Sequence, residues 1–384
     1  MSLKVCAVTS SRADWGLLAP VLALLRDDSA FDLKIIVTGQ HLAAEAGETA
    51  RDIAGDGFLI AETVDMHLTG DTSEAVTASL AAALAGYGKA YARLAPDLLL
   101  VLGDRYEILG AVMAAALAGI PVAHIAGGDV TEGAVDDAFR HAMTKMSHLH
   151  FVTTDEAGRR VRQLGEDPAR VFVTGSPGLD RIRTAKLLDR DAFFAAVGLK
   201  PGKKNLMVTF HPETLAADTE NHCREMLAAL DRLGPDVALL FTGTNADVQG
   251  LAIGKLITEF VAKHANAVLH PSLGSARYFS ALKHVDAVVG NSSSGLYEAP
   301  SFGIPTINIG DRQKGRARAA SVLDVAPQRD AIFAAIQRAF TLDCKTVVNP
   351  YGDGHAAARI VAQLKTLREP GALLKKRFVD WPAS

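Results

Sequence analysis

Short, unbroken apolar runs alternate with longer amphipathic segments along most of this chain, and this alternation most constrains the fold. Strands that helices cover on both faces read as continuous apolar runs. The runs predict strands at 4–9, 33–38, 97–102, 121–125, 149–153 and 171–174, then at 206–210, 238–242, 267–269, 287–289 and 306–309. The segments between them predict helices at 16–26, 42–53, 73–94, 106–118, 136–146 and 156–164. Helices and strands in this order predict an α/β protein with parallel, doubly wound sheets.

A turn at Gly175-Ser176-Pro177-Gly178 separates two series of such units. The chain has 384 residues, 49% of them hydrophobic, which suffices for two separate cores. We expect one domain at 1–178 and a second at 179–365, which begins with a connecting helix at 179–197 and ends with a helix at 355–367. The tail at 366–384 is expected to pack back on the first domain.

Composition excludes several classes of protein. The formal net charge of −3 gives no electrostatic basis for binding nucleic acid. Three cysteines lie far apart without a CxxC pair, which argues against a disulfide framework or zinc site and favours a reducing cytoplasm. The start of the chain lacks a leader pattern, and the most apolar stretch, 111–126, contains Pro121 and His124. We therefore expect a cytoplasmic protein without a membrane span.

The stretch 285–316 carries the strongest signal for a ligand. The apolar run 285–289 ends at Gly290, and Asn291, Ser292 and Ser293 then lead into a predicted helix at 296–301. Free backbone N–H groups and serine hydroxyls at such a helix start suit a phosphate group. The alternative is that Ser292 or Ser293 only caps the helix.

A cationic loop follows the next predicted strand, at Gly310-Asp311-Arg312-Gln313-Lys314-Gly315-Arg316. Ligands of open α/β sheets bind outside the carboxyl ends of the strands, where this loop and the serine loop would meet. Glu298 is a suitable acceptor for two ribose hydroxyls. The combination predicts a site for a nucleotide diphosphate, most simply of a nucleotide sugar.

Polar loops also follow two strands of the first half. Arg12 follows the first strand and could bind a diphosphate in bidentate fashion, or simply pair with Asp14 on the surface. Asp104 and Arg105 follow the strand at 97–102, where Asp104 could instead be a helix N-cap.

The loop after the strand at 121–125 is the richest in titratable groups. Gly127 and Gly128 would let the backbone approach a ligand closely, and Asp129 and Asp136 follow them. The helix dipole accounts equally for Asp136 and Asp137, and either could pair with Arg140. In the second half, His211 begins a His-Pro-Glu loop and is a candidate proton donor or phosphate contact.

Metal and dinucleotide sites are disfavoured. His148 and His150 share one face of a strand, but neither a carboxylate nor a cysteine accompanies them in the sequence. The first strand is followed by SSRADWG rather than GxGxxG, and no GxxxxGK[ST] motif occurs. We therefore expect neither a metal nor a nicotinamide cofactor.

Five motifs, taken in order, resemble the hydrolysing UDP-N-acetylglucosamine 2-epimerases of sialic acid and related nonulosonic acid biosynthesis. These motifs are TSSRADWG, LGDRYE, HIAGGDVTEGAVDDAFRHAMTKMSHLHF, TFHPET and GNSSSGLYEAPSFGIPTINIGDRQKGR. The resemblance extends from about residue 4 to 365. It implies a GT-B-like fold of two Rossmann-like domains with the active site in the cleft between them. It also implies release of UDP with inversion at C2 of the sugar, without a cofactor.

The resemblance assigns roles by position. Nucleotide and phosphate contacts are implied at Arg12, Ser292, Ser293, Glu298 and Arg312, and Gly290, Asn291, His270 and Arg316 complete the predicted binding set. Asp104 and Asp136 match catalytic acidic positions, Arg105 lies beside them, and His211 matches a histidine of the domain cleft.

One departure from the family pattern concerns the acid–base groups. The sialic acid branch often has HxEGG where this chain has His124-Ile125-Ala126-Gly127-Gly128, so Ala126 replaces a carboxylate. Either Asp129 substitutes for that acid, or Ala126 makes room for a bulkier sugar such as a UDP- or GDP-linked 2,4-diacetamido-2,4,6-trideoxyhexose.

Other functions share the same fold and are kept as alternatives. A GT-B glycosyltransferase would need an acceptor, a non-hydrolysing epimerase would keep UDP attached, and a nucleotide-sugar sensor would leave its ligand intact.

Relatives suggest a homo-oligomer, a dimer or tetramer, and the alanine-rich helix at 73–94 is the expected interface.

Overall fold

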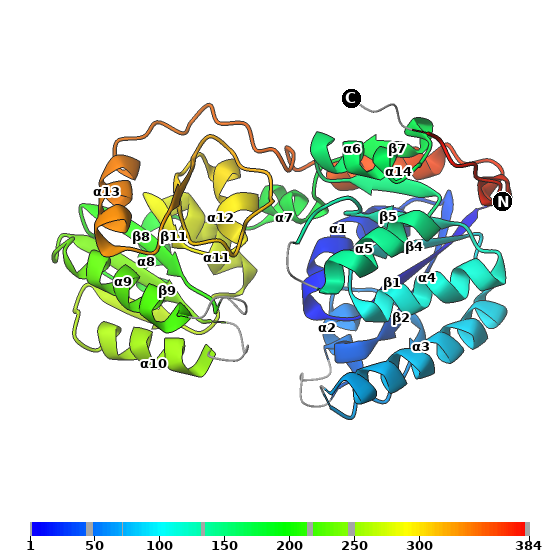
Figure 1. The fold of residues 1–384 in the computed structure, drawn as a ribbon, viewed down its shortest axis with the longest axis horizontal. Helices are drawn as coiled ribbons and strands as arrows, with labels where there is room; N and C mark the ends of the chain where they lie inside the picture. The colour runs from blue at the N-terminus through cyan, green and yellow to red at the C-terminus, as the bar shows by residue number, and fades with distance from the viewer. Residues whose placement is uncertain are drawn as a thin grey trace. The chain divides into compact units, whose positions relative to one another are not determined.

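A computed structural model describes residues 2–43, 49–70, 72–131, 135–212, 218–244 and 250–380. The chain divides into two compact units (Figure 1). The first unit contains Met1–Arg181 together with Tyr351–Ser384, and the second contains Ile182–Pro350. Both ends of the chain therefore belong to the first unit.

The first unit is built on a parallel sheet that has seven strands in the part of the chain described here, in the order β3-β2-β1-β4-β5-β6-β7. The strands are β1 (Leu3–Thr9), β2 (Phe31–Thr38), β3 (Ile60–Val64), β4 (Leu98–Leu102), β5 (Val122–Ile125), β6 (Leu149–Val152) and β7 (Val171–Val173). The direction of strand addition reverses between β1 and β4. This reversal creates a topological switch point, next to which ligands bind in open α/β sheets.

Helices cover both faces of this sheet. They are α1 (Arg12–Asp27), α2 (Ala50–Gly55), α3 (Ser73–Leu94), α4 (Tyr106–Ala118), α5 (Val135–Met146), α6 (Asp155–Gln163) and α14 (Ala356–Lys365), with short 3-10 turns between some of them. Leu18 and Leu22 of α1 and Ile360 of α14 are buried in one core against one face, and Tyr87 of α3 and Val112 of α4 are buried in the core on the other. The continuous apolar strands are thus explained by burial on both faces.

The second unit repeats this design with a parallel sheet in the order β10-β9-β8-β11-β12-β13. Its strands are β8 (Lys204–Thr209), β9 (Val237–Thr242), β10 (Ala267–His270), β11 (Ala287–Gly290), β12 (Thr306–Ile309) and β13 (Val322–Val325). The helices are α8 (Arg190–Val197), α9 (Thr219–Asp231), α10 (Gly250–Val261), α11 (Gly274–His284), α12 (Ser294–Tyr297) and α13 (Arg329–Ala339). Its switch point lies between β8 and β11. The predicted fold class, two doubly wound parallel sheets in series, is confirmed.

Two strands were not predicted, and one expected helix is divided. The strands β3 and β13 were missed because both lie at sheet edges and are only partly buried, so neither reads as a continuous apolar run. The connecting helix expected at 179–197 is replaced by a 3-10 turn at Pro177–Leu179, a short helix α7 (Asp180–Thr184) and α8.

The last helix, expected in the second domain, packs in the first unit. Ala357, Ile360 and Leu364 of α14 are buried in the same core as α1. The carboxylate of Asp180 accepts hydrogen bonds from the backbone N–H groups of Ala356 (3.0 Å) and Ala357 (2.9 Å), which caps the helix start. The chain that follows α14 also lies on this unit, where Arg170 donates to the carbonyl of Leu373 at 2.9 Å.

No helix in the described part of the chain combines the length and the apolarity that a membrane crossing requires.

Candidate active site

Polar loops follow the strands that flank the switch point of each sheet. In the first unit they follow β1, β4 and β5, and in the second they follow β8, β11 and β12. The carboxyl ends of parallel strands share one edge of a sheet, so the loops of each unit gather at one edge. Each unit therefore presents one set of candidate functional residues.

The loop after β1 is shaped by Asp14 rather than by Arg12. The buried carboxylate of Asp14 accepts hydrogen bonds from Thr9 Oγ1 (2.8 Å) and from the backbone N–H groups of Ser10 (2.8 Å) and Ser11 (2.9 Å). Burial opposes ionisation, but the nearby ring of His41 and these hydrogen bonds lower the pKa of Asp14. Asp14 thus stays charged and fixes the loop.

Arg12 lies at the first position of α1, and its side chain is 75% exposed. Its guanidinium donates to the carboxylate of Asp52 at 2.7 Å. The alternative that Arg12 pairs with Asp14 is wrong, because the backbone and hydroxyl groups around Asp14 already occupy that carboxylate. The exposed pair with Asp52 is a weak one that a diphosphate could displace.

Arg140 joins the acidic loops of the first unit. Its guanidinium, 8% exposed, donates to the carboxylate of Asp104, to the carbonyl of Asp129 (2.8 Å) and to Thr131 Oγ1 (3.1 Å). One residue of α5 thereby connects the loop after β4 with the loop after β5. The sequence pointed to Arg140 only as a partner of Asp136 or Asp137; its contact with Asp104 requires the fold.

The two residues after β4 have different partners. Arg105, not Asp104, occupies the N-cap position of α4, so the N-cap interpretation of Asp104 was wrong. Arg105 donates to the buried carboxylate of Glu107 at 2.6 Å. Asp104 faces Arg140 instead and is only partly buried.

Asp136, in the first turn of α5, differs electrostatically from Asp104. Burial raises the pKa of Asp136, and the negative charge of Asp104 raises it further, while Arg105 and Arg140 oppose the shift. Asp104 has a direct guanidinium partner, whereas the Asp136 carboxyl group holds its proton to higher pH than usual. Two nearby carboxyl groups with unlike environments are a common arrangement for acid and base catalysis.

The glycines after β5 are explained by packing. A Cβ atom on Gly128, whose φ is +77°, would lie 2.3 Å from the carbonyl oxygen of Ala157 in α6. A Cβ atom on Gly127 would lie 2.8 Å from Thr144 Oγ1. These contacts within the unit, and not a close ligand, account for both glycines, contrary to our interpretation.

The rest of this loop carries Ala126 and Asp129. Ala126 has a φ of +63°, a backbone conformation that residues other than glycine rarely adopt. Asp129 accepts a hydrogen bond from Thr153 Oγ1 at 2.6 Å. His124 precedes them, and burial lowers its pKa to about 3, so its ring is neutral. Glu132 and Gly133, which belong to the same loop, lie outside the described residues.

His150 lies on β6, whereas His148 precedes that strand, and in the described part of the chain only His150 has a carboxylate partner, which the sequence did not predict. His150 Nε2 lies 3.0 Å from the carboxylate of Glu166, which follows α6. The described residues contain no group of three metal-binding side chains around either histidine.

In the second unit, Asn291 ties together the loops that follow three strands. Its side chain pairs with the backbone of His211 after β8, and its carbonyl accepts hydrogen bonds from Gln313 Nε2 (2.8 Å) and the Arg312 guanidinium (3.3 Å) after β12. Gln313 is 1% exposed and was not predicted as a site residue. Arg316 donates to Gln313 Oε1 at 2.9 Å, and Glu213, beside His211, lies outside the described residues.

The serine loop precedes a helix of one turn, α12. Ser293 occupies the N-cap position but makes no side-chain capping bond, so the N-cap alternative is not supported for Ser293. Ser292 Oγ accepts a long hydrogen bond (3.4 Å) from the backbone N–H of Ser294. The hydroxyl of Tyr278 in α11 donates to Ser294 Oγ, a contact that the sequence did not predict.

Other predicted binding residues have structural roles. Gly290 has a φ of +134°, and a Cβ atom there would lie 1.9 Å from the carbonyl oxygen of Thr209 in β8. His270 Nε2 lies 2.9 Å from the carbonyl oxygen of Val197. Glu298 was expected inside a helix at 296–301, but it lies between α12 and a 3-10 turn at Ala299–Phe302.

Two doubly wound parallel sheets in series, with polar loops at each switch point, define the GT-B-like class of α/β proteins. The chain belongs to the UDP-N-acetylglucosamine 2-epimerase family, whose model matches residues 23–365.

Similar proteins make the comparison more specific. A GDP/UDP-N,N′-diacetylbacillosamine 2-epimerase (hydrolyzing) of Campylobacter jejuni is 38% identical and covers 84% of each chain. A UDP-N,N′-diacetylbacillosamine 2-epimerase (hydrolyzing) of Legionella pneumophila is 34% identical over 98% of this chain and 99% of its own. The crystal structure of the UDP-GlcNAc 2-epimerase from Neisseria meningitidis bound to UDP-GlcNAc shares the fold, with a TM-score of 0.75, 20% identity, and coverage of 94% of this chain and 99% of that one.

Proposed function

We propose that this protein is a hydrolysing 2-epimerase that acts on N,N′-diacetylbacillosamine, a 2,4-diacetamido-2,4,6-trideoxyhexose, linked to UDP or GDP. Two hydrolysing relatives at 38% and 34% identity are named for this sugar. UDP-N-acetylglucosamine is the second candidate substrate, since a relative from Neisseria meningitidis named for it is 29% identical.

The observation that carries the proposal is the acidic pair of the first unit, Asp104 beside Arg140 and Asp136 with its raised pKa. The C2 hydrogen of a sugar has no adjacent carbonyl, so it becomes acidic only as the C1–O bond to the diphosphate breaks. Elimination then removes the proton from C2 and releases the nucleoside diphosphate, leaving a glycal. Water adds its oxygen to C1, and a proton returns to the opposite face of C2.

Two faces of the sugar require two proton carriers. We assign these roles to Asp104 and Asp136, with Asp129 as the candidate to replace the carboxylate absent at Ala126. Each well-placed general acid or base contributes roughly 10²–10⁴-fold to the rate. Arg105 completes this set, because its guanidinium is held by Glu107 and its positive charge opposes the rise in the pKa of Asp136.

The second unit supplies groups for the nucleotide. Arg312, Ser292 and Ser293 are suited to the diphosphate, and Glu298 to the ribose hydroxyls. The hydrogen bonds of Asn291 fix the loops that carry His211 and Arg312. Donors held in place before the reaction stabilise a departing anion by about 3 kcal/mol each. We also assign a phosphate contact to Arg12, whose surface pair with Asp52 is weak.

Ala126 supports the choice of the larger sugar. A methyl group at this position occupies less space than the glutamate often found in the sialic acid branch. An acetamido group at C4 of the sugar needs such space, whereas the hydroxyl of N-acetylglucosamine does not.

Proton NMR in D₂O tests the proposal with three substrates: the UDP- and GDP-linked diacetamido sugars and UDP-N-acetylglucosamine. We expect free nucleoside diphosphate and a manno-configured sugar deuterated at C2, fastest with a diacetamido sugar. Release of diphosphate only when a sugar acceptor is present would instead identify a glycosyltransferase. Three intact nucleotide sugars would contradict hydrolysis altogether.

We further propose a cytoplasmic homo-oligomer, a dimer or tetramer that uses the alanine-rich outer face of α3. Ala81, Ala85 and Gly88 lie exposed on this helix. Burial raises the pKa of the Cys6 and Cys223 thiols to about 12, which suits cysteines that remain reduced. Light scattering of the purified protein determines its oligomeric state.

A further inference from the structure

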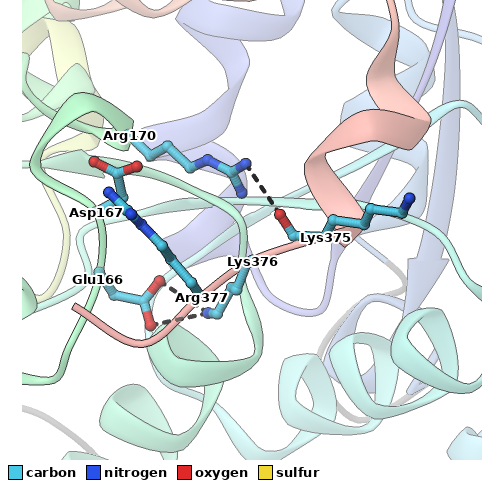
Figure 2. A pocket seen from close by; sticks show the side chains of 6 residues that line it. All are labelled: Glu166, Asp167, Arg170, Lys375, Lys376 and Arg377. Atoms are coloured by element: carbon cyan, nitrogen blue, oxygen red, sulfur yellow. Dashed lines mark hydrogen bonds and ion pairs between the residues drawn. The ribbon is translucent and has the colours of Figure 1, made fainter.

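A polar cavity of about 500 Å³ lies on the first unit. It is found at the amino ends of the strands, whereas the candidate active site lies at their carboxyl ends. Figure 2 shows its lining residues, which are Glu166, Asp167, Arg170, Lys375, Lys376 and Arg377. Glu166 to Arg170 precede β7, and the other three belong to the chain that follows α14. The loops that carry Asp104 and Asp129 instead follow the carboxyl ends of β4 and β5.

Positive charge predominates in this cavity. Four of its lining residues are cationic and two are acidic. Glu166, whose side chain is 2% exposed, is already fully engaged: it accepts hydrogen bonds from Lys145 Nζ (2.8 Å) and Lys376 Nζ (2.8 Å). The two lysines outnumber this carboxylate, so the buried network neutralises none of the remaining cations.

The cations nearest the solvent have few partners. Arg170 donates to the carbonyl groups of Leu373 and Lys375, which are neutral. The side chains of Lys375 and Arg377 are exposed, and neither has a hydrogen bond or ion pair with another described residue. Asp167 is the one acidic group left to balance these three cations among the lining residues, and it also caps the backbone N–H of Ala169.

The cationic segment is held in place by specific contacts. Lys376 Nζ donates to the carbonyl groups of Lys145 (2.6 Å) and Ser147 (2.7 Å). The backbone N–H of Val379 donates to the carbonyl of Gly165 at 3.0 Å. The ring of Phe378 covers Gly165 so closely that a Cβ atom there would lie 2.3 Å from it. Lys375 and Arg377 therefore flank an anchored residue and project from a fixed backbone.

Two helices run between the candidate active site and this cavity. Helix α5 carries Asp136 in its first turn, Arg140 near its middle and Lys145, a partner of Glu166, in its last turn, about 14 Å from Asp136. Arg160, in the last turn of α6, donates to the carbonyl of Gly128 in the loop after β5, and Glu166 follows the end of that helix. A ligand that moved Lys145 or Glu166 would act on elements that also hold the acidic loops.

We propose that this cavity is a regulatory site for an anion that carries a phosphate or diphosphate group. Three cations around one carboxylate suit a ligand with two negative charges, and arginine binds phosphate oxygens in bidentate fashion. A nucleoside diphosphate, a nucleotide sugar and inorganic phosphate share this chemistry. This site goes beyond the proposed catalytic function, because an anion binds to it whether or not the enzyme turns over its substrate.

Isothermal titration calorimetry of the intact protein with inorganic pyrophosphate tests the site. The double variant Lys375→Ala with Arg377→Ala removes one lysine and one arginine from the cavity. The matched control, Lys4→Ala with Arg368→Ala, removes the same charges from exposed positions elsewhere in this unit. We expect two sites per chain in the natural protein and in the control, one of them at the serine loop. In the cavity variant we expect the site at the serine loop to be unchanged and the cavity to bind pyrophosphate at least tenfold more weakly.

Titrations with inorganic phosphate and with UDP then distinguish the sources of the anion. Tighter binding of UDP than of pyrophosphate at the cavity indicates a nucleoside ligand, and equal binding indicates a free phosphate compound. The same stoichiometry in the cavity variant as in the natural protein overturns the proposal. A site lost equally in the control variant also overturns it, since the effect is then one of net charge.

Kinetics test the regulatory role with the same variants. Pyrophosphate is expected to change kcat at saturating substrate in the natural protein and the control, and to leave kcat unchanged in the cavity variant, whose basal activity is preserved. If calorimetry shows the second site but pyrophosphate acts only on KM, the site has no regulatory role. An inactive natural protein contradicts the proposed function, while the calorimetric result on the cavity still stands.

Discussion

The side chain of Asn291 pairs with both backbone groups of His211. Its Oδ1 accepts from the His211 N–H at 2.7 Å, and its Nδ2 donates to the His211 carbonyl at 2.9 Å. An amide side chain can make both bonds at once, as a neighbouring strand would. Asn291 is fully buried, so neither bond can be replaced easily by water.

Replacing this amide tests the arrangement of the nucleotide loops. Asn291→Asp keeps the size of the side chain but turns the Nδ2 donor into an oxygen that faces the His211 carbonyl. We expect UDP to bind about tenfold more weakly. We also expect the free energy of unfolding to fall by about 1–3 kcal/mol, the usual effect of an unsatisfied buried polar group. Calorimetry with UDP and urea denaturation measure these. Lost stability with unchanged UDP affinity would restrict Asn291 to a structural role.

The acidic pair predicts a separation of catalysis from nucleotide binding. Asp104→Asn and Asp136→Asn should each lower kcat by about 10²–10⁴-fold, because each removes a proton carrier. UDP affinity should stay within about threefold. Asp155→Asn, in the exposed first turn of α6, is the matched control. Full activity in either variant would remove that residue from the mechanism.

Arg140 predicts a change in pH dependence. Its positive charge lowers the pKa of Asp136, against the larger effect of burial. Arg140→Met should therefore raise that pKa further and move the acidic limb of the kcat/KM profile to higher pH, together with a loss of kcat of about tenfold or more. Arg159→Met, at an exposed position of α6, should leave the profile in place. An unmoved limb would show that Asp136 does not set it.

Ala126 predicts substrate preference. Ala126→Glu and Ala126→Gln have nearly the same volume and differ in charge. If space decides, both should shift kcat/KM about tenfold from the diacetamido sugar toward UDP-N-acetylglucosamine, on the scale of a few displaced methylene groups. A shift in the glutamate variant alone would point to the charge. Preference unchanged in both would refute the argument from space.

Glu166 predicts stability in acid. Burial alone would raise its pKa, but hydrogen bonds from His150, Lys145 and Lys376 lower it to about 2. A carboxyl pKa below its unfolded value stabilises the folded state above that unfolded value, near pH 4.5, and the stabilisation is lost as the pH falls toward 2.

Glu166→Gln should therefore lower the free energy of unfolding by about 2–3 kcal/mol at pH 7, and by progressively less below pH 4.5. Denaturation of both proteins by urea between pH 7 and pH 3 measures the difference. Glu156→Gln removes a half-exposed carboxylate and serves as the control, with an expected effect below about 1 kcal/mol. A difference that is constant with pH would contradict the assignment.

The sequence predicted the central strands well and the sheet edges poorly. Helices 73–94 and 106–118 were predicted with the bounds that α3 and α4 have, because long apolar periodicity leaves little ambiguity. The strands β3 and β13 escaped because half-buried edge strands lack a continuous apolar run. The placement of α14 depends on contacts with α1, far away in sequence, which no local pattern records.

For the candidate site, sequence motifs identified the loops and the ion pair of Arg140 with Asp137 (3.6 Å), but few of the other partners. Asp104 was expected near a base or at a helix cap, and its actual partner is Arg140, 36 positions along the chain. The glycines at 127 and 128 looked like room for a ligand, whereas α6 and Thr144 occupy that space. Gln313 and Tyr278 gave no signal because single polar residues near strand ends are common.

The first unit needs the last part of the chain to complete its core, since α14 and the segment after it pack there. During synthesis the ribosome therefore makes the whole second unit before it releases the residues that finish the first. N-terminal domains usually fold first, but here the first unit can be completed only after the second unit has been synthesised. A released chain that ends near residue 350 would hold a complete second unit attached to a first unit in which the apolar side of α1 lacks the helix that covers it.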